Sequence, residues 1–151
     1  MTSTIDRPLR ASHVPAQSPA CSEDARQLCS LREAHRRSVI ERIAGPVVTA
    51  LYVLVRPGQD PAARLDVARA TAARCGYTIA DVLVDDAWRT EPALRPRLAR
   101  AHAALHQGRI HGLVAASRVD ISSDDGPYEQ ELHRLRGAGG FLHLAHDEFR
   151  F

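Results

Sequence analysis

The sequence contains no lysine and no asparagine, and its only methionine is Met1. All 20 basic residues are therefore arginines, and 18 acidic residues balance them to a net charge of +2. This residue usage is typical of a GC-rich genome, so the arginine count alone does not indicate DNA binding. Because the net charge is close to zero, the chain as a whole does not attract polyanions through bulk positive charge.

Aromatic residues make up only 5% of the chain, so a core must be built mainly from Ala, Val, Leu and Ile. The three cysteines, Cys21, Cys29 and Cys75, show no C-x-x-C spacing, and their odd number does not suit a disulfide framework. The chain opens without a signal-peptide pattern. Its longest apolar run, residues 47–55, is far shorter than the ~20 residues of a membrane helix. We expect a cytoplasmic protein without a membrane segment.

The 151 residues, 44% of them hydrophobic, suit one globular domain. Residues 1–21 are rich in Ser, Thr, Ala and Pro without an apolar period, which predicts a disordered tail. Residues 22–45 repeat Leu and Val at helical spacing and predict an amphipathic helix or linker. We expect the opposite face of that helix to carry Arg32, Arg36, Arg37 and Arg42.

From residue 46 to residue 151, apolar β-rich runs alternate with helical patterns, and Gly76 and Gly108 mark helix ends. The predicted strands are 47–55, 77–84, 110–116 and 141–145. Strands that alternate with helices need crossover connections. The pattern therefore predicts a three-layer α/β domain with a largely parallel sheet of four or five strands, flanked by helices.

Several short segments of this domain occur in an order and spacing that resemble the catalytic domain of serine recombinases, the resolvases and invertases. They are Leu-Tyr-Val-Leu-Val at 51–55, the Gly-Tyr step at 76–77, Val-Leu-Val-Asp-Asp at 82–86, Leu-Arg-Pro-Arg-Leu at 94–98 and Gly-x-x-x-Gly at 108–112. The resemblance covers about residues 49–145 and implies a resolvase-like fold. It also implies a family activity of site-specific DNA recombination through a phosphoserine link to DNA.

The resemblance fails at the residues that perform this chemistry. Arg56 occupies the position of the nucleophilic serine, and Leu54 that of the arginine two residues before it. A guanidinium stays protonated and cannot act as the nucleophile. The family loop Leu-Asp-Arg-Leu-x-Arg aligns with residues 118–124 in two registers, and each register loses both arginines. The family's long helix and DNA-binding domain have no counterpart before Phe151.

Asp85 and Arg95 remain at family positions. Two retained residues are too few to perform strand transfer. We therefore predict a domain that does not cleave DNA, with no cofactor and no metal. His143 and His146 lack the i, i+4 spacing of a helical zinc motif. The cysteines, with Cys75 expected on an apolar helix face, are interpreted as structural or incidental. Asp85-Asp86 is more simply a solvated turn than a metal site or general base.

One cluster is typical of a nucleic-acid contact, because an aromatic side chain, Trp88, lies among guanidiniums. Its arginines are Arg89, Arg95, Arg97 and Arg100. The simpler interpretation is a solvated helix face in a chain whose only basic residue is arginine.

Three functional hypotheses follow. The first is a non-catalytic recombinase domain, a mobile-element remnant or a partner of an intact recombinase, as a homodimer or in association with that enzyme. The second is a DNA-associated regulator. The third is a small-ligand or nucleotide-binding α/β domain whose strand ends place Arg56, Asp85, Asp86 and Asp120 around one crevice. A translation start near Val47 or Val48 would leave the predicted α/β domain intact. Whether residues 1–45 belong to the functional protein therefore needs a separate test.

Overall fold

The protein folds around a four-stranded sheet, seen in a computed structural model that describes residues 19–86 and 91–150. The strands are β1 (Val48–Val55), β2 (Thr78–Asp86), β3 (Gly112–Ala115) and β4 (Phe141–Leu144). Their order is β2-β1-β3-β4, and every pair is parallel. The predicted fold class is confirmed. The sequence analysis expected four or five strands, and the described residues form four.

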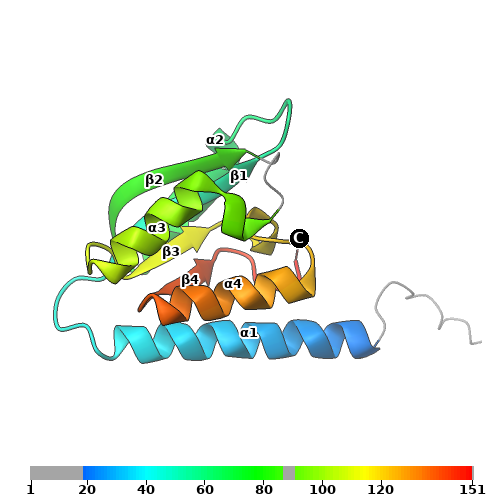
Figure 1. The fold of residues 1–151 in the computed structure, drawn as a ribbon, viewed down its shortest axis with the longest axis horizontal. Helices are drawn as coiled ribbons and strands as arrows, with labels where there is room; N and C mark the ends of the chain where they lie inside the picture. The colour runs from blue at the N-terminus through cyan, green and yellow to red at the C-terminus, as the bar shows by residue number, and fades with distance from the viewer. Residues whose placement is uncertain (1–18, 87–90, 151) are drawn as a thin grey trace, which may run out of the picture.

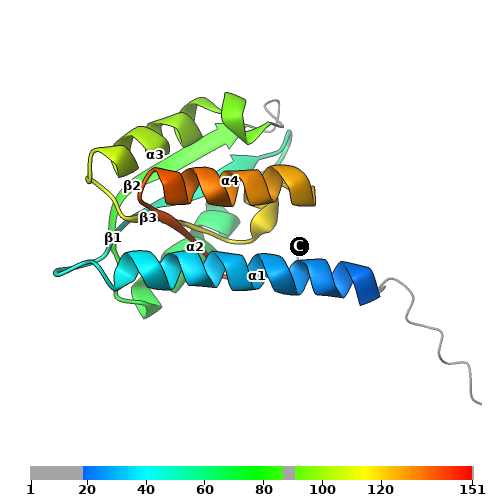
Figure 2. The same ribbon diagram turned by 60° about the horizontal axis from the view of Figure 1, so that its bottom comes forward.

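Helices cover both faces of this sheet (Figures 1 and 2). α2 (Ala62–Arg74) packs against β1 and β3 on one face, whereas α3 (Pro96–His106) and α4 (Asp125–Gly137) cover the other. Two short 3₁₀ helices, η3 (Pro92–Leu94) and η4 (Arg118–Asp120), precede α3 and α4. β1 is central and buried along nearly its whole length, which explains its continuous apolar sequence.

The two faces of the sheet have separate hydrophobic clusters, as the alternation of side chains along β1 requires. Tyr52 belongs to the cluster under α3 and α4, whereas Leu51 belongs to the cluster under α2. Close packing at the β4 end depends on glycine, because a Cβ at Gly112 would lie 2.7 Å from the ring of Phe141. Phe141 therefore packs directly against the backbone of the neighbouring strand.

The first helix, α1 (Pro19–Ile40), lies alongside β4 and α4 (Figures 1 and 2). It begins three residues before the predicted start and ends five before the predicted end. Residues 19–21 of the predicted tail at 1–21 are therefore helical, and residues 1–18 lie outside the described residues. Leu28 of α1 is buried with the α3/α4 cluster and Val39 with the α2 cluster. α1 thus contacts both hydrophobic layers from the edge of the sheet.

The expectation that Arg32 lies on the solvent face of this helix is wrong. Arg32 is 3% exposed, and its Nε donates to the Glu148 carboxylate at 2.5 Å. The Tyr128 hydroxyl donates to the same carboxylate at 2.6 Å. Arg36 is half-buried, whereas Arg37 and Arg42 are exposed as predicted. The buried ion pair joins α1 to a segment 116 residues further along the chain.

The prediction that Cys75 lies on an apolar helix face is also wrong. Cys75 caps the C-terminus of α2 and is exposed, and Gly76 follows it with a φ of 74°. A left-handed residue ends the helix and turns the chain toward β2. In the described part of the chain, every helix is too short or too polar to cross a membrane.

Candidate site at the carboxyl edge of the sheet

The parallel strands bring the ends of β1, β2 and β3 to one edge of the sheet, where ligands of open α/β sheets usually bind. Arg56 follows β1 there, Asp85 and Asp86 end β2, and η4 with Asp120 follows β3. The sequence analysis placed its candidate residues at this edge. The contacts of each side chain decide which of them can meet a ligand.

Asp85 is buried and fully engaged inside the protein. Its carboxylate accepts hydrogen bonds from the backbone N–H groups of Arg97 and Leu98, each at 2.9 Å, and from the Tyr52 hydroxyl at 2.9 Å. The first two bonds satisfy free N–H groups at the start of α3. Burial, with the nearby Asp85 charge, raises the pKa of Tyr52, so that hydroxyl keeps its proton. Asp85 therefore joins β2 to α3 and fixes the tyrosine.

Arg95, the other residue retained at a family position, lies in the same interior. It is 2% exposed and donates to the backbone oxygen of Asp120 at 2.9 Å, with the Tyr52 oxygen at 3.5 Å. Asp85 and Arg95 are thus brought together through Tyr52. Because its guanidinium is buried, Arg95 does not lie on a common surface with Arg97 and Arg100.

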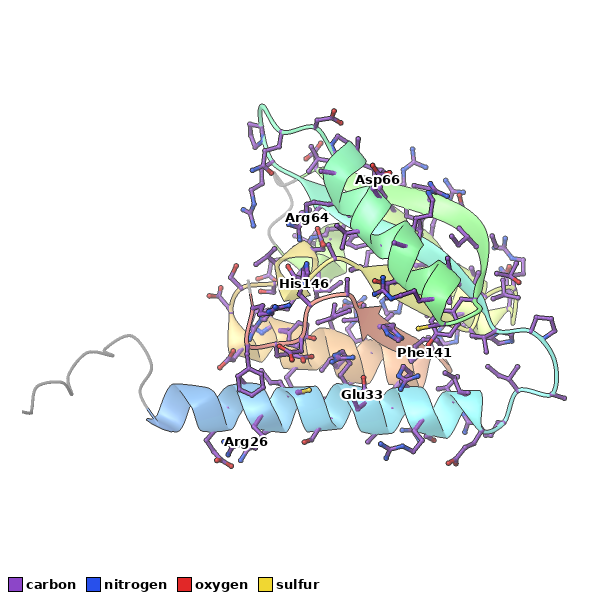
Figure 3. All side chains as sticks on the ribbon, turned by 180° about the vertical axis from the view of Figure 1, so that it is seen from behind. Arg26, Glu33, Arg64, Asp66, Phe141 and His146 are labelled. Atoms are coloured by element: carbon purple, nitrogen blue, oxygen red, sulfur yellow. The ribbon has the colours of Figure 1, made fainter. Side chains whose placement is uncertain are left out.

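A second buried network surrounds Asp120, which is 1% exposed. Arg64 of α2 pairs with both carboxylate oxygens, at 3.0 and 2.8 Å, and also donates to Ser117 at 3.0 Å. The backbone N–H of Leu54 donates to the same carboxylate at 3.1 Å. Figure 3 views the protein from the α2 side and labels Arg64. This network fastens the end of β1 and the start of α2 to η4.

Arg118 completes the interior of this edge. It is 2% exposed, donates to the backbone oxygens of Ser122 and Ser123, and pairs with Asp125 at 2.9 Å. Its guanidinium also lies 4.5 Å from the centre of the Tyr128 ring, a cation–π distance. Arg118 therefore organises the loop between η4 and α4.

Arg56 differs from these arginines because it is exposed. It lines a shallow pocket of about 170 Å³, together with Leu54, Arg95, Val119, Ser122, Ser123 and Asp124. That volume is well below the ~300–1,000 Å³ of typical small-molecule sites. Of the four residues expected around one crevice, Asp85 and Asp120 are occupied internally, while Arg56 and Asp86 are exposed.

The expected nucleic-acid cluster is only partly described, because Trp88 and Arg89 lie outside the described residues. Arg97 is exposed near the start of α3. Arg100 is exposed on the same helix and pairs with Asp81 at 3.3 Å. Two exposed guanidiniums of the cluster therefore remain on α3.

The two histidines near the C-terminus do not form one site. His143 is half-buried, and its Nδ1 lies 2.8 Å from the Tyr77 hydroxyl. His146 is exposed and contacts Arg150. In the residues that the structure describes, no group of three or more His, Cys, Asp or Glu side chains is arranged to hold a metal ion.

Sequence reasoning did not identify Arg64, Ser117 or Tyr52 as parts of this edge. Tyr52 lies in the apolar run of β1, and Arg64 lies in a helix with many charged residues. One available signal was the position of Arg64 near the start of α2, because the helix after a parallel strand begins at the carboxyl edge.

These features define the class of domain to which the chain belongs. It is an open, all-parallel α/β domain in which charged side chains at the strand ends bond to groups inside the protein. The solved structures that match this fold include serine recombinase catalytic domains. One is the C-terminal catalytic domain of ISC1926 TnpA, an IS607-like serine recombinase, with a TM-score of 0.58 and 14% identity over 68% of this chain and 74% of that chain.

Another is the N-terminal catalytic domain of TP901-1 integrase, with a TM-score of 0.58 and 13% identity over 65% of this chain and 76% of that chain. At the level of sequence, no family model and no curated protein matches. The predicted resemblance is thus confirmed in three dimensions. At this identity, it establishes a resolvase-like fold.

Proposed function

We propose that this chain is a serine recombinase-like domain that binds DNA without cleaving it and acts in DNA-associated regulation. The observation that carries the proposal is Arg56, which stands exposed at the end of β1, where the family resemblance expects the nucleophilic serine. No serine or cysteine lies between Pro46 and Asp60 to replace it. Cleavage through a covalent link to DNA needs such a nucleophile.

The buried networks support the same proposal. Strand cleavage is promoted by guanidiniums that reach the phosphate in the transition state. Here Arg95 and Arg118 are buried against backbone oxygens, and Arg64 is committed to Asp120. Side chains that stabilise the fold in this way are not free to gather around a phosphate.

The exposed arginines support DNA association. Arg56 follows the carboxyl end of β1 and Arg97 lies in the first turn of α3, and neither has a carboxylate partner among the ion pairs described. Exposed guanidiniums contact phosphates without reading sequence, and each such contact adds about 0.9 to the salt dependence of binding. We therefore expect weak binding of DNA that is dominated by phosphate contacts.

The test is incubation of the purified chain with supercoiled plasmid over a salt series, followed by native and denaturing gels. We expect a mobility shift that weakens as salt rises, with no nicked plasmid and no covalent adduct. An adduct would refute the loss of cleavage, and the absence of any shift at low salt would refute DNA association.

Matched variants test where on the protein the DNA binds. Arg56→Gln and Arg97→Gln should each reduce the log–log salt slope by about 1. Arg26→Gln is the control, because Arg26 is an exposed arginine of α1 paired with Glu23. Equal effects of all three changes would mean that the carboxyl edge is not where DNA binds.

A further inference from the structure

Four side chains, from α1, from β4 and from the turn between α2 and β2, form a hydrogen-bonded chain on the α2 side of the molecule, away from the carboxyl edge. The Arg36 Nη1 of α1 lies 3.4 Å from the Tyr77 hydroxyl, which lies 2.8 Å from Nδ1 of His143 on β4. The other ring nitrogen of His143 lies 3.8 Å from the sulfur of Cys75. Figure 3 labels Glu33 and Phe141 in this part of the structure.

The direction of the hydrogen bonds at His143 depends on its tautomer, and one tautomer links all four groups in a single chain. A guanidinium can only donate, so the Tyr77 oxygen accepts from Arg36. In that tautomer the Tyr77 hydroxyl donates to Nδ1 of His143. The imidazole is neutral at pH 7, because burial and then the charges of Arg36 and Arg32 lower the pKa of His143 to about 4. A neutral ring that accepts at Nδ1 carries its proton on Nε2.

The result is an N–H donor directed at the sulfur of Cys75. A thiolate is the reactive form of cysteine, and donors and positive charges stabilise it. Cys75 is exposed, so reagents in solution reach it. Cys29 is the internal reference thiol, and burial, followed by the charge of Glu148, raises the pKa of that thiol.

We propose that Cys75 is a reactive thiol, activated by the Arg36–Tyr77–His143 chain, and that hydroperoxides are the class of reagent that modifies it. Cys75 is exposed at the C-terminus of α2, which suits a small reagent that approaches from solvent. The site is independent of the proposed DNA-associated function, because it shares no residue with the carboxyl edge.

The reaction is a two-electron transfer from sulfur to the peroxide. The thiolate attacks the terminal oxygen, an S–O bond forms, and the O–O bond breaks. The leaving hydroxide or alkoxide takes up the proton that the thiol released when it ionised, and Cys75 becomes a sulfenic acid. A second thiol in solution can then condense with it and release water.

The experiment treats the full chain with hydrogen peroxide at pH 7 in the presence of dimedone, which traps sulfenic acids. Trypsin separates the two thiols into peptides 27–32 and 75–89, so mass spectrometry follows each rate. We expect Cys75 to react at least about tenfold faster than Cys29 and than Cys75 in the denatured chain. If folding does not accelerate Cys75, the proposal is overturned.

Variants test the hydrogen-bonded chain itself. Tyr77→Phe removes one hydroxyl and keeps the ring, and His143→Leu removes the donor. Each should lower the Cys75 rate several-fold, whereas His143→Gln places an amide donor near the sulfur and should retain most of it. His106→Leu changes an exposed histidine of α3 and should leave the rate unaltered. A Cys75 rate that is the same in Tyr77→Phe and His143→Leu as in the parent chain would remove Tyr77 and His143 from the mechanism.

Discussion

The two edges of the sheet are protected very differently. The β4 edge lies beside α1, which contributes to both hydrophobic layers and is fixed by the Arg32–Glu148 pair. At the β2 edge, Val82 and Val84 are each 38% exposed on a nine-residue strand. Helical cover is one way in which proteins block strand edges. The comparison indicates that stability is concentrated at the β4 edge, where residues before the α/β pattern take part in the fold.

The largest expected effect follows from removal of α1. A chain that begins at Val47 loses Leu28 and Val39 from the two cores and also loses Arg32, the arginine partner of Glu148. We expect it to be unfolded or insoluble, as judged by circular dichroism and sedimentation. A chain that begins at Pro19 retains every contact described here and serves as the control. A stable, cooperative fold from Val47 would show that α1 is dispensable.

A single substitution at the same edge should be less severe but still large. Arg32→Ala leaves a buried carboxylate unpaired, which typically costs about 3–5 kcal/mol. Arg26→Ala, on an exposed turn of the same helix, removes a pair whose side chains are 63% and 54% exposed and should cost less than about 1 kcal/mol. Urea unfolding measures both values, and equal values would contradict the comparison.

Acid should weaken the β4 edge through two histidines. Burial, followed by the charges of Arg36 on His143 and of Arg136 on His35, lowers the pKa of each ring, to about 4 for His143. The unfolded chain then binds protons more tightly, so this stability is fully present above about pH 6.5 and is lost as the pH falls toward the folded pKa values.

We expect the free energy of unfolding to fall by about 1–2 kcal/mol between pH 7 and pH 5. His143→Gln should reduce that dependence, whereas His106→Gln, at an exposed position of α3, should not. Urea titrations at the two pH values provide the measurement. A stability that rises on acidification would show that the sign of the argument is wrong.

The smallest effect is expected at the β2 edge. Val84→Thr replaces a half-exposed side chain with a residue that also suits strands, and it should change stability by less than about 0.5 kcal/mol. The matched change is Val53→Thr on β1, where the side chain is 1% exposed and the buried hydroxyl should cost more than 1 kcal/mol. Similar costs at both positions would mean that the β2 edge is covered in solution.

The sequence predicted the fold because its strands are apolar runs separated by helices with recognisable ends, such as Gly76 and Gly108. The orientation of Arg32 could not be predicted, because helical spacing assigns a charged residue to solvent unless its partner is known. That partner, Glu148, is distant in the sequence and lies after the last strand.

The candidate site was predicted only in its location. Parallel strands place Arg56, Asp85 and Asp120 at one edge. The sequence does not show that the carboxylates of Asp85 and Asp120 already accept hydrogen bonds from donors inside the protein. Cys75 and His143 are 68 residues apart and meet only in the folded chain. Spacing along the chain carries no signal for such a pair.

The Arg32–Glu148 pair also bears on how the chain is made. Arg32 leaves the ribosome 116 residues before its carboxylate partner, which at about 5–20 residues per second is a delay on the order of ten seconds. During that interval α1 has neither β4 to pack on nor a counter-charge for its arginine. The earliest segment of the domain to be synthesised is therefore among the last to be locked in place.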